Sequence, residues 1–395
     1  MASALSGIKV LDLAGIGPAS FAAMMLADMG ADVIKINMPP GAGDKGVGGG
    51  MTFVDTFDPG TLRNKKNTAI NLKAEAGKQL FNRLAETADV IIEANRPGVM
   101  DRLGVGYEAI SKINPRIIYC SVSGYGQDSP YRDLSGHDNN YAGMGGALEF
   151  IGYSPEDPPV LVQTVLADMN AAVMQATIGI LLAICARERT GKGQQVDISM
   201  TDGVVYLLNT IPEAAEYFMT GVVPQRGQGL FGGNNAFYTV YKTLDDKYLT
   251  IGCLEPHFWF KLCMAIDRED LIPRQYVSSP EKEEVLEDLK QVFQTKNRDE
   301  WFELLSKADV PVGKVLGVDE VISDPNVQHR KMIFDYDHPR FGKTTQIGFP
   351  VKLSDTPWEL RMPAASLGEH TDEVLSSLGC SRDEIDAWRQ ERVIY

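Results

Sequence analysis

Three residues that can carry protons stand in three unusual settings along this chain. His137 lies in the polar run Ser135–Tyr141, Asp168 directly precedes a long apolar stretch, and Glu255 follows an alternating strand pattern and precedes Pro256. A neutral imidazole exchanges protons near neutral pH, and a positioned carboxylate can do the same when its surroundings shift its pKa. If the fold brings the three together, the residue types suit a site that removes and returns a proton.

Each of the three also has a plainer interpretation. His137 could be a loop histidine bonded to backbone, Asp168 the cap of the helix that follows it, and Glu255 a solvated loop acid. The cap position of Asp168 is compatible with catalysis, because a helix start offers backbone N–H groups and a positive dipole end. Such groups can stabilise an oxyanion while the carboxylate moves a proton.

Two segments could contact a ligand. The turn Gly15–Ser20, which contains Ile16 and Gly17, follows a predicted strand but lacks the third glycine of a dinucleotide fingerprint, so NAD(P) is not expected. The cluster of Arg63, Lys65 and Lys66 offers charged donors to phosphate groups, or is simply a solvated basic loop.

The elements that must position these residues alternate between strand and helix. The apolar patterns predict strands at 8–13, 31–36, 89–93 and 117–122, and helices at 21–29, 74–88 and 107–113. This order predicts an α/β fold with a parallel, Rossmann-like, doubly wound sheet.

The pattern changes after about residue 225, where 236–243 and 248–252 predict a β-hairpin followed by charged helices. We therefore expect a large Rossmann-like domain joined to a smaller α+β domain. The expected divisions are a large domain at 1–200, a linker at 201–225, a small domain at 226–330, and a linker with a return to the large domain at 331–395.

Composition narrows the function classes. The net charge of −15 argues against general binding to nucleic acid. The five cysteines are scattered without a C-x-x-C pair, which favours reduced thiols and a cytoplasmic location. The apolar run at 171–186 is shorter than a membrane span and is interpreted as a buried helix, and no cluster has metal-ligand spacing.

Taken together, the motifs resemble one family over essentially the whole chain. Gly136–Tyr141, Asp168 and Gly252–Phe258 occur in the order found in the family III CoA-transferases, a superfamily that includes the α-methylacyl-CoA racemases. The resemblance implies that His137 and Asp168 are catalytic and that Glu255 bonds to the histidine ring. It also implies an interlocked homodimer with shared active sites.

The resemblance assigns further residues to the substrate. It implies that coenzyme A is bound by Arg63, Lys65, Lys66, Arg96 and Tyr125, and that the pocket near the thioester includes Ile16, Gly17, Met169, Asn234 and Asn235. The chain departs from the racemase pattern at Met38, where an arginine usually helps hold the nucleotide, and at Asn234 and Asn235, whose amides could admit a polar acyl group.

The resulting prediction is a racemase or epimerase of 2-methylacyl-CoA thioesters that needs no cofactor beyond the coenzyme A of its substrate. One base removes the acidified α-proton, and the opposite acid reprotonates the enolate on its other face. The alternative is a CoA-transferase in which Asp168 is the nucleophile. A third possibility is a protein that binds acyl-CoA without turning it over.

Overall fold

The computed structural model describes residues 3–15, 17–41 and 60–395 and divides into two compact units. The first unit is formed by 1–145, 162–206 and 328–395, and the second by 146–161 and 207–327. Each unit is therefore discontinuous in sequence, and the chain leaves the first unit twice before its C-terminal part returns to it.

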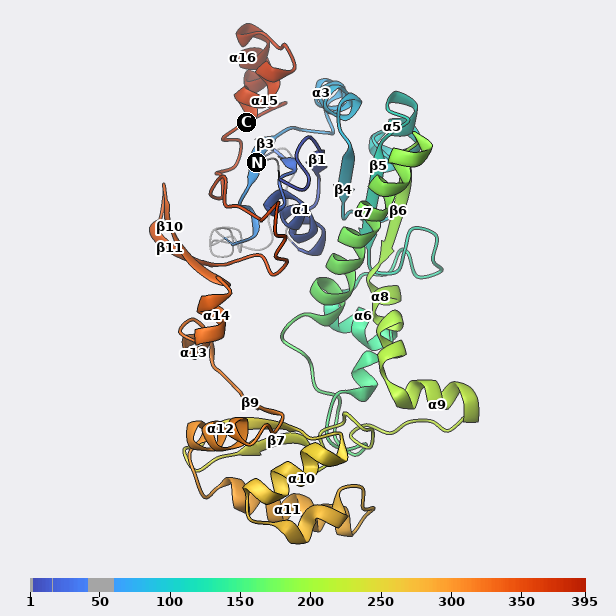
Figure 1. The fold of residues 1–395 in the computed structure, drawn as a ribbon. Coiled ribbons are helices and arrows are strands. Elements are labelled where there is room, and N and C mark those ends of the chain that lie inside the picture. Colours follow the sequence, from blue (N-terminus) through green and yellow to red (C-terminus); the bar gives the residue numbers. More distant parts are fainter. Residues whose placement is uncertain (1–2, 16, 42–59) are drawn as a thin grey trace. The chain divides into compact units, whose positions relative to one another are not determined.

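A six-stranded parallel sheet forms the centre of the first unit (Figure 1). In spatial order its strands are β3 (Lys65–Ala69), β2 (Asp32–Asn37), β1 (Lys9–Asp12), β4 (Val90–Glu93), β5 (Ile118–Ser123) and β6 (Gln194–Ser199). Leu11 of β1 lies opposite Ile34 on one side and Ile91 on the other. The order 3-2-1-4-5-6 is that of a Rossmann-type sheet, which confirms the predicted α/β class.

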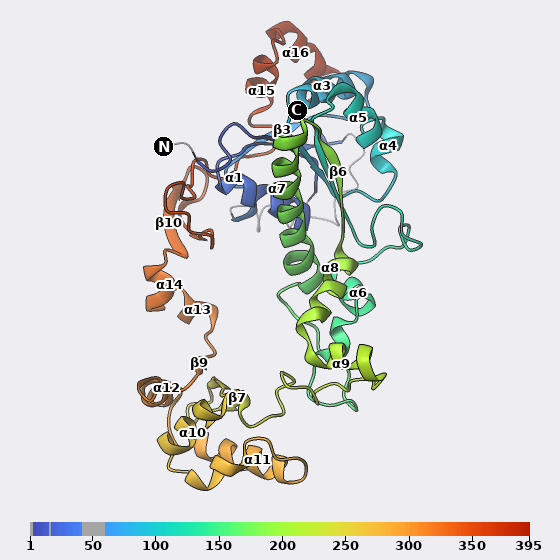
Figure 2. The ribbon, with the colours of Figure 1, turned by 45° about the vertical axis from the view of Figure 1, so that its right-hand side comes forward.

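Helices cover both faces of this sheet (Figure 2). One face carries α1 (Pro18–Asp28) and α7 (Val173–Thr190), which pack against each other. The opposite face buries Leu11, Ile91 and Tyr119 against the remaining large helices. These are α3 (Glu75–Glu86), α5 (Tyr107–Ile113), α15 (Thr371–Ser377) and α16 (Arg382–Gln390).

Helix α7 is longer than its sequence pattern predicts. A π-helical segment, η2 (Leu166–Ala172), runs directly into it, and together they form a 25-residue helix that is long and apolar enough, by length and composition, to cross a membrane. The core helix of a globular protein passes the same test. The sequence predicted a buried helix here, and the single chain buries only one side of α7, at positions such as Ala176 and Ile180.

Shorter elements complete the first unit. They are α4 (Val99–Leu103), α6 (Asp138–Met144), α8 (Met200–Leu207) and the antiparallel pair β10 (Ile333–His338) and β11 (Gly342–Ile347). Helix α14 (Pro325–His329) spans the division in sequence between the second unit and the returning part of the first. Helix α6 packs against η2. That contact brings a segment that follows β5 beside a segment that precedes α7.

The second unit contains the predicted hairpin. Strands β7 (Tyr238–Lys242) and β8 (Tyr248–Gly252) are antiparallel, and β9 (Val312–Lys314) adds a third strand. Its helices are η1 (Ala147–Phe150), η3 (Leu208–Thr210), α9 (Pro212–Thr220), α10 (Pro256–Ala265), η4 (Glu269–Arg274), α11 (Glu281–Phe293), α12 (Arg298–Lys307) and α13 (Val318–Val321). Trp259 and Trp301 are fully buried in its core.

Candidate active site

A cavity of about 440 Å³ opens at the carboxyl ends of β4 and β5 in the first unit. Its walls include Arg96 after β4, Tyr125 after β5, and His137 and Tyr141 at the start of α6. Ligands of doubly wound sheets bind outside the carboxyl ends of the strands, near the point where the strand order reverses. Here the order reverses between β1 and β4, so the cavity lies beside the expected place.

The backbone of His137 is fixed while its side chain stays exposed. His137 is the residue before α6 and is extended, with φ of −132°, and its N–H donates to Asn140 Oδ1 at 2.9 Å. This is the reverse half of a capping box. The local sequence therefore fixes the backbone position of His137, and its imidazole lies on the wall of the cavity.

Asp168 lies in the first turn of η2. One of its carboxylate oxygens, Oδ1, is buried and has no hydrogen-bond partner among the residues the structure describes. Burial, the largest effect, and the nearby Asp138 carboxylate together raise the pKa of Asp168 to about 6, while the proximity of His137 acts in the opposite direction. A carboxyl group with that pKa can exchange protons near neutral pH.

The backbone around Asp168 does not offer the free donors expected of a helix start. Asp138 Oδ1 accepts from the N–H of Ala167 at 2.6 Å and from the N–H of Asp168 at 3.0 Å. The next N–H, that of Met169, donates to the carbonyl of Val165. The prediction that these groups hold an enolate oxygen is therefore wrong, because they already have acceptors.

A tyrosine pair packs beside the two candidate bases. The rings of Tyr125 and Tyr141 meet edge to face with centroids 5.3 Å apart, and the Tyr141 hydroxyl donates to the carbonyl of Gly136 at 2.5 Å. A Cβ at Gly136 would lie 2.6 Å from the Tyr141 ring, and one at Gly124 would lie 2.3 Å from it. Both glycines thus let the ring approach the backbone, and their positions in the sequence, at 124 and 136, are the local signal for this packing.

Arginine side chains gather along the same edge. Arg96 donates to the Ser135 hydroxyl at 2.6 Å and, in the part of the chain that the structure describes, forms no ion pair. Arg132, which the sequence did not single out, lines this cavity and a neighbouring one of about 150 Å³. Terminal nitrogens of Arg102 and Arg132 lie 3.2 and 3.5 Å from where a Cβ would stand at Gly98. Clustered guanidinium groups are suited to bind phosphates.

The predicted phosphate cluster is arranged differently from the expected loop. Arg63 is 3% exposed and forms an ion pair with Asp28 at 2.6 Å, and Lys65 is 1% exposed and lies 2.9 Å from Asp12. Lys66 alone is partly exposed. The sequence suggested a basic loop because the residues of β3 are polar. In the structure, Lys65 of this strand belongs to a buried ionic network. Neither Arg63 nor Lys65 faces solvent.

A lysine of the neighbouring strand β2 holds the loop after β1. Lys35 donates to the carbonyls of Ala14 and Gly15. Gly17 precedes α1 with φ of 129°, a conformation that favours glycine, and Pro18 occupies the first helical turn, where its missing N–H costs no hydrogen bond.

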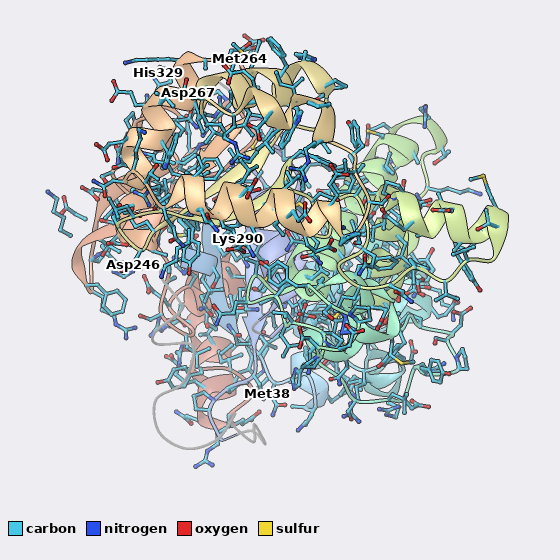
Figure 3. All side chains as sticks on the ribbon, turned by 90° about the horizontal axis from the view of Figure 1, so that it is seen from below. Met38, Asp246, Met264, Asp267, Lys290 and His329 are labelled. Carbon is cyan, nitrogen blue, oxygen red and sulfur yellow. The ribbon has the colours of Figure 1, made fainter. Side chains whose placement is uncertain are left out.

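Two further residues that the sequence singled out are Ile16, for the pocket near the thioester, and Met38, where the racemase pattern has an arginine. Ile16 lies outside the described residues. Met38, labelled in Figure 3, directly follows β2 and is partly exposed.

The remaining predicted residues belong to the second unit, apart from Met169 in η2. Glu255 is exposed at the start of α10, and its carbonyl accepts from the N–H of Phe258. Both asparagine amides are engaged: Asn234 donates to the Gly227 carbonyl at 3.0 Å, and Asn235 donates to the Leu230 carbonyl at 3.1 Å. These amides therefore hold their own glycine-rich loop.

The first unit places two proton-carrying side chains in segments that pack together, and one of them, His137, lines the cavity. His137 and Asp168 come from segments about thirty residues apart, joined where α6 packs on η2. Among the described residues no group of three or more histidine, cysteine, aspartate or glutamate side chains could hold a metal ion.

Comparison with known proteins gives the family. The profile of CoA-transferase family III matches residues 5–371. The chain is 33% identical to human α-methylacyl-CoA racemase over 400 residues, covering 99% of this chain and 97% of the relative. It is 31% identical over 421 residues to a formyl-CoA:oxalate CoA-transferase of Escherichia coli O157:H7 (strain EC4115 / EHEC), covering both chains fully.

A solved structure agrees with these sequence matches. A CaiB/BaiF family protein from Brucella suis superposes with a TM-score of 0.82 at 29% identity, covering 96% of this chain and all of the other. The matches extend over both units and include enzymes of two reaction types. The chain belongs to the family III CoA-transferases.

Proposed function

We propose that this protein is a racemase or epimerase that interconverts R and S 2-methylacyl-CoA thioesters. The observation that carries the proposal is Asp168, whose pKa is raised to about 6 beside the imidazole of His137. A two-base reaction needs one proton-carrying group on each side of the reacting carbon. Relatives of this chain include α-methylacyl-CoA racemases.

In the proposed reaction the thioester acidifies the hydrogen on the α-carbon. Neutral His137 takes that proton, the electron pair moves onto the thioester oxygen as an enolate, and protonated Asp168 returns a proton to the opposite face. In the reverse direction the ionised Asp168 is the base. Glu255, by its resemblance to family members, would bond to the His137 ring and stabilise its charged form. No cofactor beyond the substrate's coenzyme A is required.

Coenzyme A would lie along the arginine-lined edge. Arg96 and Tyr125 stand on the cavity wall, and Arg132 adds a second guanidinium, so the phosphates would meet charged donors there. Lys66 is partly exposed, but its ammonium group lies beside Asp32, the first residue of β2, and beside Glu373, so it is not assigned to this edge. Arg63 and Lys65 are not assigned to phosphate, because both are buried on carboxylate partners. Gly17, Met169, Asn234 and Asn235 would shape the acyl pocket.

The second candidate is a CoA-transferase that moves CoA between carboxylic acids. The buried, unpartnered Oδ1 of Asp168 favours it, because an oxygen without a hydrogen bond is available to attack a thioester carbonyl. The attack would form an acyl-aspartyl anhydride and release CoA thiolate. The thiolate would then attack the aspartyl carbonyl of the anhydride, which forms an aspartyl-CoA thioester and releases the first acid as its carboxylate. Formyl-CoA:oxalate CoA-transferases are among the relatives.

The deciding experiment incubates a chiral 2-methylacyl-CoA with the enzyme in D₂O without an acceptor acid, followed by mass spectrometry and chiral analysis. Deuterium at the α-carbon with loss of optical purity supports the racemase. No exchange, but CoA transfer once carboxylic acids are added, overturns it in favour of the transferase. Binding of acyl-CoA with neither reaction would leave a protein that only binds.

We extend the proposal to a homodimer in the cytoplasm. Helix α7 exposes Met174, Ile178 and Leu182 along one side, and a second copy of the chain would cover them. All five cysteines are free thiols, which fits a reducing compartment.

A further inference from the structure

One carboxylate joins the two segments that carry the candidate bases. Asp138 directly follows His137 as the first residue of α6, and its Oδ1 accepts two backbone N–H groups from η2, those of Ala167 and Asp168. The donors are consecutive, and both contacts are charge-assisted. Asp138 thus caps η2 from another part of the chain, although it lies about thirty residues earlier in sequence.

The segment that Asp138 caps has an unusual backbone. Val165, just before η2, has φ of 57° and ψ of 76°, a left-handed conformation that a β-branched residue rarely adopts. The seven residues that follow are π-helical, a form seen mostly as short functional segments. Such backbone persists only where its surroundings hold it. The carboxylate of Asp138 is one such restraint, and it acts on the backbone N–H of Asp168 itself.

We propose that Asp138 is a positioning residue that holds the first turn of η2, and with it Asp168, beside the start of α6 through these two hydrogen bonds. The inference rests on the proposed function, in which Asp168 must gain and lose a proton in each turnover. Both hydrogen bonds are accepted by Oδ1 of Asp138, and they connect this side chain to the backbone of η2. Its role is to act through Asp168.

The charges around Asp168 support this role. Asp138 raises the pKa of Asp168, after burial, and His137 lowers it. Burial and then the charge of Asp168 raise the pKa of the Tyr141 hydroxyl, so Tyr141 is a third ionisable side chain, after Asp138 and His137, that is coupled to Asp168. Helices α1, α7 and α8 also carry charged residues, namely Asp28, Asp202, Arg187, Glu188 and Arg189, but none of these is among the causes of the Asp168 shift. Asp138 is therefore the only described carboxylate that makes Asp168 harder to ionise.

Two variants separate the hydrogen bonds from the charge. Asp138→Asn keeps an oxygen that can accept both N–H groups and removes the charge, whereas Asp138→Ala removes both. Asp133→Asn, on the exposed loop before α6, is the matched control for loss of one negative charge. The full-length protein is labelled with carboxyl-¹³C aspartate and titrated by NMR, and the Asp168 signal is assigned from its absence in Asp168→Asn.

We expect Asp138→Asn to move the Asp168 titration midpoint to lower pH, with the control unchanged. In the D₂O assay, we measure kcat in the direction of reaction in which ionised Asp168 removes the proton. In that direction kcat of Asp138→Asn should stay within a few fold of the wild-type value. Asp138→Ala should lose roughly ten- to a hundredfold in kcat, because the carboxylate of Asp168 is no longer held in place.

Two results would overturn the inference. One is an Asp168 midpoint in Asp138→Asn equal to that of wild type, and the other is equal kcat values for Asp138→Ala and wild type. The NMR measurement needs no turnover, so it still decides the matter if the racemase assignment fails. If Asp138→Ala does not fold, the comparison of Asp138→Asn with the control remains sufficient.

Discussion

At the level of single residues, His137 and Asp168 are held in different ways. The imidazole is exposed at a helix start that its own neighbours fix, whereas the carboxylate is half-buried and lacks a partner for one oxygen. The local runs drew attention to both residues, and the family resemblance, not the runs alone, assigned them a catalytic role. The sequence could not predict Asp138 as the link between them, since that contact depends on the packing of α6 against η2.

The two residues should differ in their response to substitution. In a two-base racemase, His137→Ala and Asp168→Asn each stop racemisation, with losses of about 10²–10⁴-fold, and each leaves exchange on one face only. In a transferase, Asp168→Asn abolishes transfer while His137→Ala retains it. Chiral analysis of product from each variant, in D₂O and with acceptor acids, distinguishes the two patterns. Equal loss of transfer in both variants would contradict the transferase scheme.

The raised pKa of Asp168 also predicts how stability depends on pH. The folded protein holds the Asp168 proton up to a pH of about 6, whereas the unfolded chain releases it near 3.8. Between these values the native state binds more protons, so this residue makes stability fall as pH rises through that window. Asp168→Asn removes the effect and should be more stable than wild type at pH 7 but not at pH 4. Urea unfolding of both proteins at pH 7 and at pH 4 tests this. The same difference in free energy of unfolding between variant and wild type at the two pH values would contradict the prediction.

At the level of elements, the apolar strands and helices of the central sheet were predictable from pattern alone. Strands β1, β2, β4 and β5 are apolar runs between helical patterns, and each lies where the alternation predicts it. Strand β3 was not predictable, because its residues Lys-Lys-Asn-Thr-Ala look like a solvated loop. It is buried through ionic contacts instead of apolar ones, and pattern reasoning does not detect a strand held that way.

That ionic network gives a prediction about β3. Asp12 is fully buried, and its carboxylate meets Lys65 at 2.9 Å and Lys35 at 3.5 Å. Asp12→Asn would leave two buried ammonium groups without a counter-charge, a loss of about 3–5 kcal/mol in the free energy of unfolding. Lys65→Met still leaves Asp12 paired with Lys35 and should cost clearly less. Denaturant unfolding of both variants checks the order, and a larger loss for Lys65→Met would show that Asp12 is not the centre of the network.

At the level of the whole molecule, α7 determines what the single chain leaves uncovered. Positions 174, 178, 182 and 185 follow a helical spacing of three to four residues along one side, and all four are exposed. The opposite side packs on α1 and the sheet. The sequence predicted a buried helix because both sides are apolar, and nothing local could show that the fold of one chain covers only one of them.

A second copy of the chain would complete that burial, and the association can be measured. Leu182 is 64% exposed on α7, and Leu244, at the hairpin turn of the second unit, is 60% exposed. Leu182→Lys should convert a dimer to a monomer in light scattering, because a charge in an apolar interface loses its hydration, whereas Leu244→Lys should leave the mass unchanged. A wild-type monomer, or a Leu182→Lys dimer of wild-type affinity, would rule out this face as the interface. If the monomeric variant keeps its fold and loses activity, the active site depends on the partner subunit. If it keeps full activity, one chain supplies every group that the reaction needs.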